Sequence, residues 1–355
     1  SPFKTHQWSG GPIIVDNVRS TQQVTITNPA VNSDHVGTLI YANADDVETA
    51  INNARIWDGD DQTQRSEILR TAADLYEDNF GQLFALLTRE AGKTTADAIA
   101  ELREAVDFLR YYADQAESLT DASPRGIFTC ISPWNFPLAI FTGQIAAALS
   151  VGNGVLAKPA ETSSLCAVLA VNLLHQAGVP KSALQLLPGE GAVVGAALSA
   201  HASINGVCFT GSTLTAKRIN SAMAEQAPID APLIAETGGL NAMIVDSTAL
   251  PEQAVNDIIA SAFQSAGQRC SALRVLYVQQ DIAPDFMVML YGAMEEQVVA
   301  DPWLLSTDIG PVIDQTAQTK INTYIEQART EGRLLKQLDC PQSGTFVTPA
   351  ILKVK

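Results

Sequence analysis

The feature that most constrains the fold is an alternation of short apolar segments with helical ones from residue 125 onward. The apolar segments are "GIFTCIS", "NGVLAKP", "ALQLLPG", "INGVCFTG" and "PLIAETGG", and each has the length of one strand. Strands that are apolar along their whole length are buried on both faces, and strands joined through helices run parallel. The pattern therefore predicts a doubly wound α/β domain over residues 121–237.

The regions on either side of this domain have patterns of their own. Residues 1–120 contain an extended arm and then apolar residues at helical spacing over 45–57, 64–89 and 95–118. After residue 238, "NAMIVD" and "ALRVLYVQ" have the pattern of strands, with helical spacing over 251–265 and 285–299. We therefore expect a second α/β domain over residues 238–355.

One uncharged stretch, residues 135–157, is long enough to cross a membrane. It contains Gln144, Ser150, Asn153 and three glycines, with Pro137 near its start. These residues favour a buried helix, a Gly-Asn-Gly turn and a strand, so we expect no membrane span.

Charge and cysteine content exclude several classes of protein. The chain has 22 basic and 38 acidic side chains and a formal net charge of −16, which disfavours nucleic acid and anionic membranes as partners. The five cysteines form no C-x-x-C pair, so neither a disulfide framework nor a metal site is expected. Four of them (Cys130, Cys166, Cys208 and Cys340) are expected to be small core residues. No apolar core of a signal peptide is present at the start, and we expect a cytoplasmic protein.

The predicted parallel strands end in polar or glycine-rich loops. These loops are "ISPWNFP", "AKPAE", "LPGEG", "FTGST" and "AETGG". Ligands of open α/β sheets bind beyond the carboxyl ends of the strands. Five such loops predict a single extended ligand at this edge.

Taken one at a time, the loops leave alternatives open. The spacing G-x-G-x-x-x-G in "LPGEGAVVG" differs from the usual dinucleotide fingerprint and is more often a tight turn into a helix. In "FTGST" the free N–H groups of a helix from Thr213 would suit a pyrophosphate, but Ser212 could equally be a simple helix cap. Lys158 and Glu161 could bind ribose hydroxyls or form an ion pair that caps the next helix.

Cys270, in "SAGQRCSAL", is the candidate nucleophile. A free thiol needs a base near neutral pH, and all four histidines precede the second domain without a motif around them. Glu236 in "ETGG" is the better candidate, because a carboxylate in a partly dry cleft has a raised pKa and can act as general base. The amide of Asn135 and the N–H of Cys270 could stabilise an oxyanion. Taken alone, Asn135 is more commonly a turn former.

Taken together, "PWNFP", "KPAE", "FTGS", "ETGG" and "GQRC" resemble the aldehyde dehydrogenase superfamily, in the family's order and across essentially the whole chain. Longer stretches such as "SAFQSAGQRCSALRVLYVQ" look like the glutamate semialdehyde (1-pyrroline-5-carboxylate) dehydrogenase domain of bacterial proline utilization A proteins. The resemblance implies a Rossmann-like NAD-binding domain and a catalytic domain. It also implies NAD-dependent oxidation of L-glutamate γ-semialdehyde to L-glutamate in proline catabolism.

The resemblance also assigns roles to residues. It makes Cys270 the nucleophile, Glu236 the general base and Asn135 the oxyanion donor. Ser271 and Arg269 are implied to bind substrate. The implied cofactor-binding residues are Ile131, Ser132, Pro133, Trp134, Lys158, Ala160, Glu161, Gly191, Phe209, Thr210, Gly211, Ser212, Thr237 and Gly238.

Two departures from the family pattern affect these expectations. Leu240 stands where a lysine is common, and the sequence ends at "TFVTPAILKVK", before the family's E-x-F-G-P segment, substrate-carboxylate loop and oligomerisation strand. We therefore expect an incomplete catalytic domain with little activity, a flavin-dependent proline dehydrogenase domain upstream and a homo-oligomer in the complete protein. Three alternatives stay open: another aldehyde specificity, a non-catalytic scaffold, and a thiol hydrolase acting on esters.

Overall fold

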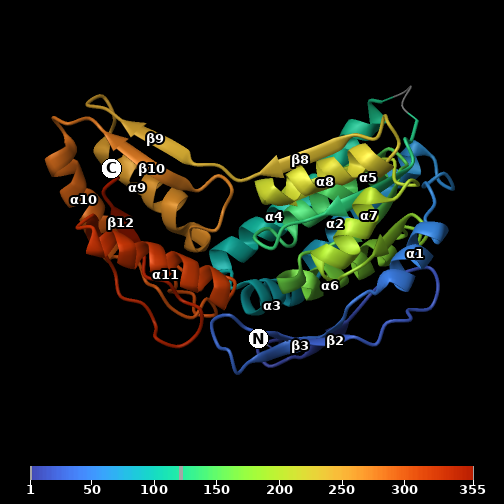
Figure 1. The fold of residues 1–355 in the computed structure, drawn as a ribbon, viewed down its shortest axis with the longest axis horizontal. Coiled ribbons are helices and arrows are strands. Elements are labelled where there is room, and N and C mark those ends of the chain that lie inside the picture. Colours follow the sequence, from blue (N-terminus) through green and yellow to red (C-terminus); the bar gives the residue numbers. More distant parts are fainter. Residues whose placement is uncertain (1, 120–122, 355) are drawn as a thin grey trace. The chain divides into compact units, whose positions relative to one another are not determined.

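The computed structural model describes residues 2–119 and 123–354. The chain divides into two compact units (Figure 1). The first unit contains residues 1–26, 35–91 and 98–237, and the second contains residues 27–34, 92–97 and 238–355. The segments 27–34 and 92–97, which the sequence pattern grouped with the N-terminal region, therefore belong to the second unit.

The first unit is built on a five-stranded parallel sheet. Its strands are β4 (Ile127–Ile131), β5 (Gly154–Lys158), β6 (Leu184–Leu186), β7 (Gly206–Gly211) and β8 (Leu233–Thr237), in the order β6-β5-β4-β7-β8. The chain proceeds outward from β4 to β6 and then returns to the other side of β4. This reversal is the doubly wound topology that the alternation predicted.

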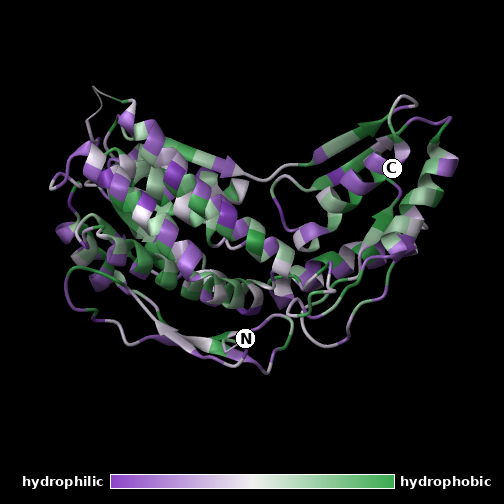
Figure 2. Cartoon of the chain, turned by 180° about the vertical axis from the view of Figure 1, so that it is seen from behind, coloured by the Kyte–Doolittle hydropathy of each residue, from purple (hydrophilic) through white to green (hydrophobic). Residues whose placement is uncertain are grey.

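Helices pack around this sheet (Figure 1). They are α1 (Ala44–Asn53), α2 (Gln62–Asp78), α3 (Phe80–Ala91), α4 (Thr95–Glu117), α5 (Ala139–Ser150), α6 (Ser164–Ala177), α7 (Ala196–Ala200) and α8 (Thr213–Gln226). Figure 2 shows hydrophilic residues beside hydrophobic ones on these helices, as expected where one side of a helix is buried. The single helix expected over 64–89 is wrong, because the chain leaves helical geometry at Asn79, where ψ is 18°.

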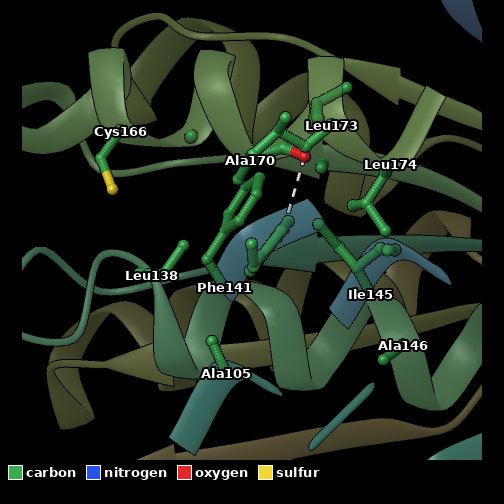
Figure 3. Packing of buried hydrophobic residues seen from close by; sticks show 14 of the residues in the cluster. Ala105, Leu138, Phe141, Ile145, Ala146, Cys166, Ala170, Leu173 and Leu174 are labelled. Carbon is green, nitrogen blue, oxygen red and sulfur yellow. Dashed lines mark hydrogen bonds between the residues drawn. The ribbon is translucent and has the colours of Figure 1, made fainter. Parts of the chain in front are cut away.

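The main core of the first unit lies where α2, α5 and α6 meet. Tyr76, Phe141 and Ile145 are at most 1% exposed. Figure 3 shows Phe141 and Ile145 of α5 pointing toward Ala170 and Leu174 of α6. The core thus fixes α5 and α6, the helices that follow β4 and β5.

The N-terminal arm forms a small sheet of three strands. These are β1 (Trp8–Gly10), β2 (Gln23–Thr27) and β3 (His35–Ile40), in the order β1-β3-β2. The N–H of Ile13 donates to the carbonyl of Leu186 in β6 (2.9 Å). The arm is therefore tied to the outer strand of the main sheet.

The second unit contains two pairs of strands and three longer helices. The strands are β9 (Asn241–Val245), β10 (Leu273–Val278), β11 (Leu334–Gln337) and β12 (Ala350–Leu352), with β9 and β10 parallel and β11 and β12 antiparallel. The helices are α9 (Pro251–Phe263), α10 (Ala283–Glu295) and α11 (Gln315–Thr330). A core of Val245, Val255, Ile258, Phe286 and Leu290 joins β9 to α9 and α10. The strand–helix alternation expected after residue 238 is present.

The uncharged stretch at 135–157 folds as the sequence predicted. It forms α5, a turn in which Gly152 has a φ of +84°, and β5. Across residues 2–119 and 123–354, the structure contains no helix that combines the length and apolar character needed to cross a membrane.

Candidate active site

Candidate residues of the first unit meet at one edge of the parallel sheet. In the strand register, Ile131 at the end of β4 pairs with Lys158 at the end of β5, and Thr210 of β7 pairs with Glu236 of β8. The N–H of Ser132 donates to the carbonyl of Lys158 (3.1 Å). Loops that are distant in sequence are thus brought together at the carboxyl ends of neighbouring strands.

Lys158 and Glu161 form an ion pair of unequal exposure. Their charged atoms are 3.5 Å apart, and the side chain of Lys158 is 3% exposed while that of Glu161 is 41% exposed. Burial lowers the pKa of Lys158, and the Glu161 carboxylate partly opposes this effect. The N–H of Gly191 donates to Glu161 (2.6 Å). Ion pairing, one of the two alternatives left open, is present, and the Glu161 carboxylate still faces solvent.

The glycine-rich segment after β6 leads directly into a helix. Gly191–Gly195 form one wide helical turn that continues into α7. The turn into a helix that the atypical glycine spacing favoured is present, but it is wide rather than tight. Through the Gly191 N–H, the turn also holds the Glu161 carboxylate.

The loop between β7 and α8 is stabilised at both ends. Ser212 caps α8 by accepting the N–H of Thr215 (3.1 Å). The amide of Gln144 on α5 donates to the Thr210 hydroxyl (3.1 Å) and to the carbonyl of Ile131 (3.4 Å). Gln144 therefore links the ends of β4 and β7, a role that the sequence analysis missed because a glutamine within an apolar helix carries no motif.

Asn135 lies in the loop between β4 and α5, and its side chain is half-buried. Ser132 and Pro133 before it are buried, and Trp134 is half-buried. Glu236 has an exposed side chain in this structure. Residues 234–236 of the edge strand β8 are all exposed, and the partly dry surrounding expected for Glu236 stays a prediction.

Cys270 lies in the loop between α9 and β10 of the second unit, and it is exposed. The amide of Asn241, the first residue of β9, donates to the carbonyls of Cys270 (2.7 Å) and Ala272 (2.9 Å). Gln268 accepts the N–H of Ile313 (2.9 Å). Two amide side chains therefore hold the loop on both sides of the thiol.

The neighbours of Cys270 have contrasting surroundings. Arg269 lies 3.4 Å from the carboxylate of Asp97, which is 1% exposed, whereas Ser271 is exposed. The ion pair with Asp97 gives Arg269 a structural role, and the expected role of Arg269 in substrate binding stays a prediction. The sequence analysis did not identify Asp97, Asn241 and Gln268 as residues that support the Cys270 loop. Asn241 in "NAMIVD" and Gln268 in "GQRC" lie within stretches quoted there, and their amide side chains were a signal that could have been used.

The turn before this loop is strained. Ser265 and Ala266 both have φ of +55°, a left-handed conformation that costs residues with a Cβ roughly 1–2 kcal/mol each. Gly267 follows with φ of +68°, and its carbonyl accepts from Arg274 (2.6 Å). Strain of this kind is concentrated at functional segments, where the surrounding structure holds it in place.

All five cysteines lie in the described residues, and Cys270 is the exposed one among them. Cys130 and Cys166 are buried, as expected. The hydrogen bond with Cys208 and burial raise the pKa of Cys130, and burial raises the pKa of Cys166. Cys208 is half-buried and packs against the main core, whereas Cys340 is half-buried outside it, so the expectation of a core position is wrong for Cys340.

A cavity of about 580 Å³ lies in the second unit and is partly lined by Ala266 and Gly267 of the strained turn. Its lining is mainly apolar, from β10, α11 and β12, and it includes none of the candidate site residues. In the described part of the chain, no group of three or more His, Cys, Asp or Glu side chains is arranged to hold a metal ion.

Residues 16–355 match the aldehyde dehydrogenase family, and the chain belongs to it. It is 50% identical to the bifunctional protein PutA of Salmonella typhimurium over 98% of this chain and 28% of that protein. It is 35% identical to 1-pyrroline-5-carboxylate dehydrogenase of Geobacillus thermodenitrificans over 96% of this chain and 71% of that protein. The chain thus spans less than a third of the length of the curated PutA proteins that it matches.

Solved structures give the same result. The structure of proline utilization A from Bdellovibrio bacteriovorus matches with a TM-score of 0.93 and 30% identity, over 97% of this chain and 38% of that chain. 1-Pyrroline-5-carboxylate dehydrogenase from Thermus with bound NAD matches with a TM-score of 0.91 and 31% identity, over 98% of this chain and 72% of that chain. The α/β fold expected from the sequence is confirmed.

Proposed function

We propose that the protein oxidises L-glutamate γ-semialdehyde, the open form of 1-pyrroline-5-carboxylate, to L-glutamate with NAD as hydride acceptor. The observation that carries the proposal is the 50% identity, over 98% of the chain, to a bifunctional PutA protein. Names of more distant relatives agree, since they are 1-pyrroline-5-carboxylate dehydrogenases. We also propose that a proline dehydrogenase partner domain supplies the substrate, since the PutA relatives are named bifunctional, and that the complete protein is a homo-oligomer.

The first unit offers groups that fit NAD. The half-exposed Glu161 carboxylate can accept hydrogen bonds from ribose hydroxyls, and the buried Lys158 ammonium holds that carboxylate in place. The N-terminus of α8 follows Gly211 and Ser212 and offers N–H groups that suit a pyrophosphate. We propose the other cofactor-binding residues of the first unit on the same basis, from Ile131 to Trp134, Ala160, Gly191, Phe209, Thr210 and Thr237, with Gly238 at the start of the second unit.

The chemistry divides among three side chains. Cys270 attacks the aldehyde carbon as a thiolate and forms a thiohemiacetal, while the Asn135 amide and the Cys270 N–H donate to the new oxyanion. NAD, when bound, would supply the hydride acceptor for oxidation of the thiohemiacetal to a thioester on Cys270. Glu236 removes a proton from water, which hydrolyses the thioester and frees the thiol. Exposure of Cys270 in a loop fits this role, because a nucleophile must be reached by its substrate.

Ser271 and Arg269 flank the thiol in sequence, and we propose that they contribute to substrate binding. The Arg269–Asp97 ion pair leaves Arg269 able to orient the loop, and the exposed Ser271 hydroxyl can donate to the substrate carboxylate.

The experiment follows NADH formation from glutamate semialdehyde by the full-length natural protein and by Cys270→Ala. The variant should lose NADH formation and thiol-dependent ester hydrolysis. Cys166→Ala is the matched control, because its thiol is buried between helices, and it should keep both activities. Dehydrogenation by Cys270→Ala would refute the mechanism, and ester hydrolysis without NADH formation by the natural protein would favour the thiol hydrolase.

A further inference from the structure

Two buried acids of the first unit lie outside the candidate site. Glu90 is near the end of α3 and Glu101 is in the first half of α4, and they are 2% and 1% exposed. Burying a carboxylate is costly unless hydrogen bonds compensate it. Both carboxyl groups are therefore expected to have specific partners, and in both cases these partners include the start of another helix.

Glu101 caps α5. Its Oε2 accepts the N–H groups of Leu138 (3.3 Å) and Ala139 (2.8 Å). Leu138 occupies the N-cap position of α5, and its side chain makes no capping bond there. It lies three residues after Asn135. The acceptor that fixes the end of the Asn135 loop thus comes from α4.

Glu90 has the same relation to α6. Its Oε1 accepts the N–H of Leu165 (2.7 Å) and its Oε2 accepts the N–H of Cys166 (2.9 Å). The N-cap residue of α6, Ser163, makes no side-chain capping bond. Leu165 lies four residues after Glu161. The end of the loop that carries the Lys158–Glu161 pair is therefore fixed from α3.

A cap supplied by another helix has a consequence that a local cap lacks. A local Ser or Asp satisfies the first N–H groups of its own helix and moves with it. A carboxylate from a separate, packed helix also fixes where that helix begins, and hence where the preceding loop ends. Displacement of a reacting group by 1 Å can cost about 10²-fold in rate. The two acids thus connect the packed helices to the two loops.

We propose that Glu101 and Glu90 are positioning residues: Glu101 fixes the loop that carries Asn135, and Glu90 fixes the loop that carries Lys158 and Glu161. The proposal rests on the proposed function for the roles of these loops. Neither acid is required to touch substrate or cofactor. The two acids should therefore control different steps, Glu101 the attack by the thiol and Glu90 the binding of NAD.

Asp46 provides a matched control in the same unit. Its side chain is fully buried and accepts the N–H groups of Arg19 (2.6 Å), Ser20 (3.2 Å) and Asn43 (3.1 Å) at the start of α1. Like Glu90 and Glu101, Asp46 is a buried acid at the start of a helix, but the segment before α1 carries none of the candidate site residues. Asp46→Ala should lower the melting temperature and leave site chemistry unchanged.

The experiment compares Glu101→Ala, Glu90→Ala and Asp46→Ala in the full-length natural protein. Three quantities are measured: the rate of the first NADH burst, the Kd of NAD by calorimetry, and the hydrolysis of p-nitrophenyl acetate without NAD. Glu101→Ala should slow the burst and ester hydrolysis at least tenfold and change the Kd less than threefold. Glu90→Ala should raise the Kd at least fivefold and leave ester hydrolysis within twofold. Equal losses in all three variants would overturn the proposal.

Conservative variants test the acceptor itself and cover the case in which an alanine variant fails to fold. Both N–H groups at α5 meet a single oxygen of Glu101, so Glu101→Gln keeps the acceptor and should stay within threefold of the natural burst rate. Glu101→Asp is shorter by one methylene and should slow the burst at least fivefold. Equal burst rates for these two variants would overturn the proposal. If the natural protein hydrolyses the ester but forms no NADH, the proposed function fails, while ester hydrolysis and the NAD Kd still test the two acids.

Discussion

Replacement of Glu90 by glutamine should change how stability depends on pH. Burial raises the pKa of Glu90 to about 8 from an ordinary value of 4.5, although the N–H groups of Leu165 and Cys166 lower it in part. Between these two values the folded state keeps a proton that the unfolded state has released. The contribution of Glu90 to stability is therefore complete below pH 4.5 and is lost as the pH rises to 8. Glutamine is neutral throughout and removes this dependence.

The size of the effect follows from the two pKa values. One pKa unit corresponds to about 1.4 kcal/mol, so the natural protein should lose about 3–4 kcal/mol between pH 5 and pH 8 relative to Glu90→Gln. For a unit of this size, each kcal/mol shifts the melting temperature by about 2–4 °C, which gives a relative shift of roughly 10 °C. The neighbouring Tyr41 and Cys166 do not contribute to the change in stability between pH 5 and pH 8, because burial raises the pKa of each above its ordinary value, which already exceeds 8.

The assay is differential scanning calorimetry of both proteins at pH 5, 6, 7 and 8. Other titrating groups are common to the two proteins and cancel in the difference between their melting temperatures. Glu67→Gln is the control, because Glu67 is an exposed residue of α2, and this variant should track the natural protein at every pH. A difference between Glu90→Gln and the natural protein that stays constant within 2 °C from pH 5 to pH 8 would refute the reasoning.

Three further changes test the site and the core. Lys158→Met should raise the Kd of NAD by roughly tenfold or more, since a hydrogen bond from a charged group contributes about 1.5–3 kcal/mol. An unchanged Kd in calorimetry would mean that the ion pair between Lys158 and Glu161 has a structural role and none in NAD binding. Asn135→Ala should slow the first NADH burst by about 10²–10³, whereas Glu236→Gln should preserve the burst better and slow the steady-state rate. If stopped-flow traces show equal losses in burst and steady state for both variants, the assignment of the two residues to different steps is wrong. Phe141→Ala should destabilise the first unit by about 3–5 kcal/mol, since Phe141 is 1% exposed in the main core; a chemical denaturation midpoint close to that of the natural protein would contradict it.

The doubly wound class of the first unit follows from the amino-acid sequence alone. Apolar strands separated by helices require a parallel sheet, and the motifs "PWNFP", "KPAE", "FTGS" and "ETGG" lie at the carboxyl ends of its strands. Local periodicity predicts these features, because each depends on residues that are neighbours along the chain. The strand register, which places Ile131 beside Lys158 and Thr210 beside Glu236, is known from the structure.

Some local features were not determined in this way. Continuous helical spacing over residues 64–89 concealed the break at Asn79, because periodicity reports which face is apolar and not where the backbone changes direction. That Cys208, in the middle of β7, is only half-buried was likewise not indicated by its apolar neighbours.

The groups that hold the loops in place become apparent in the folded structure and not in the sequence pattern. Glu90 and Cys166 are 76 positions apart, and Glu101 and Ala139 are 38 apart. Nothing in the local pattern of a glutamate in a helix indicates which distant N–H groups it will accept. Asp97 and Arg269, 172 positions apart, are a further case. Residues that carry chemistry are recognisable from short motifs, because each motif is a local stretch of sequence. The groups that orient these residues depend on how whole helices pack, and that packing is a property of the complete fold.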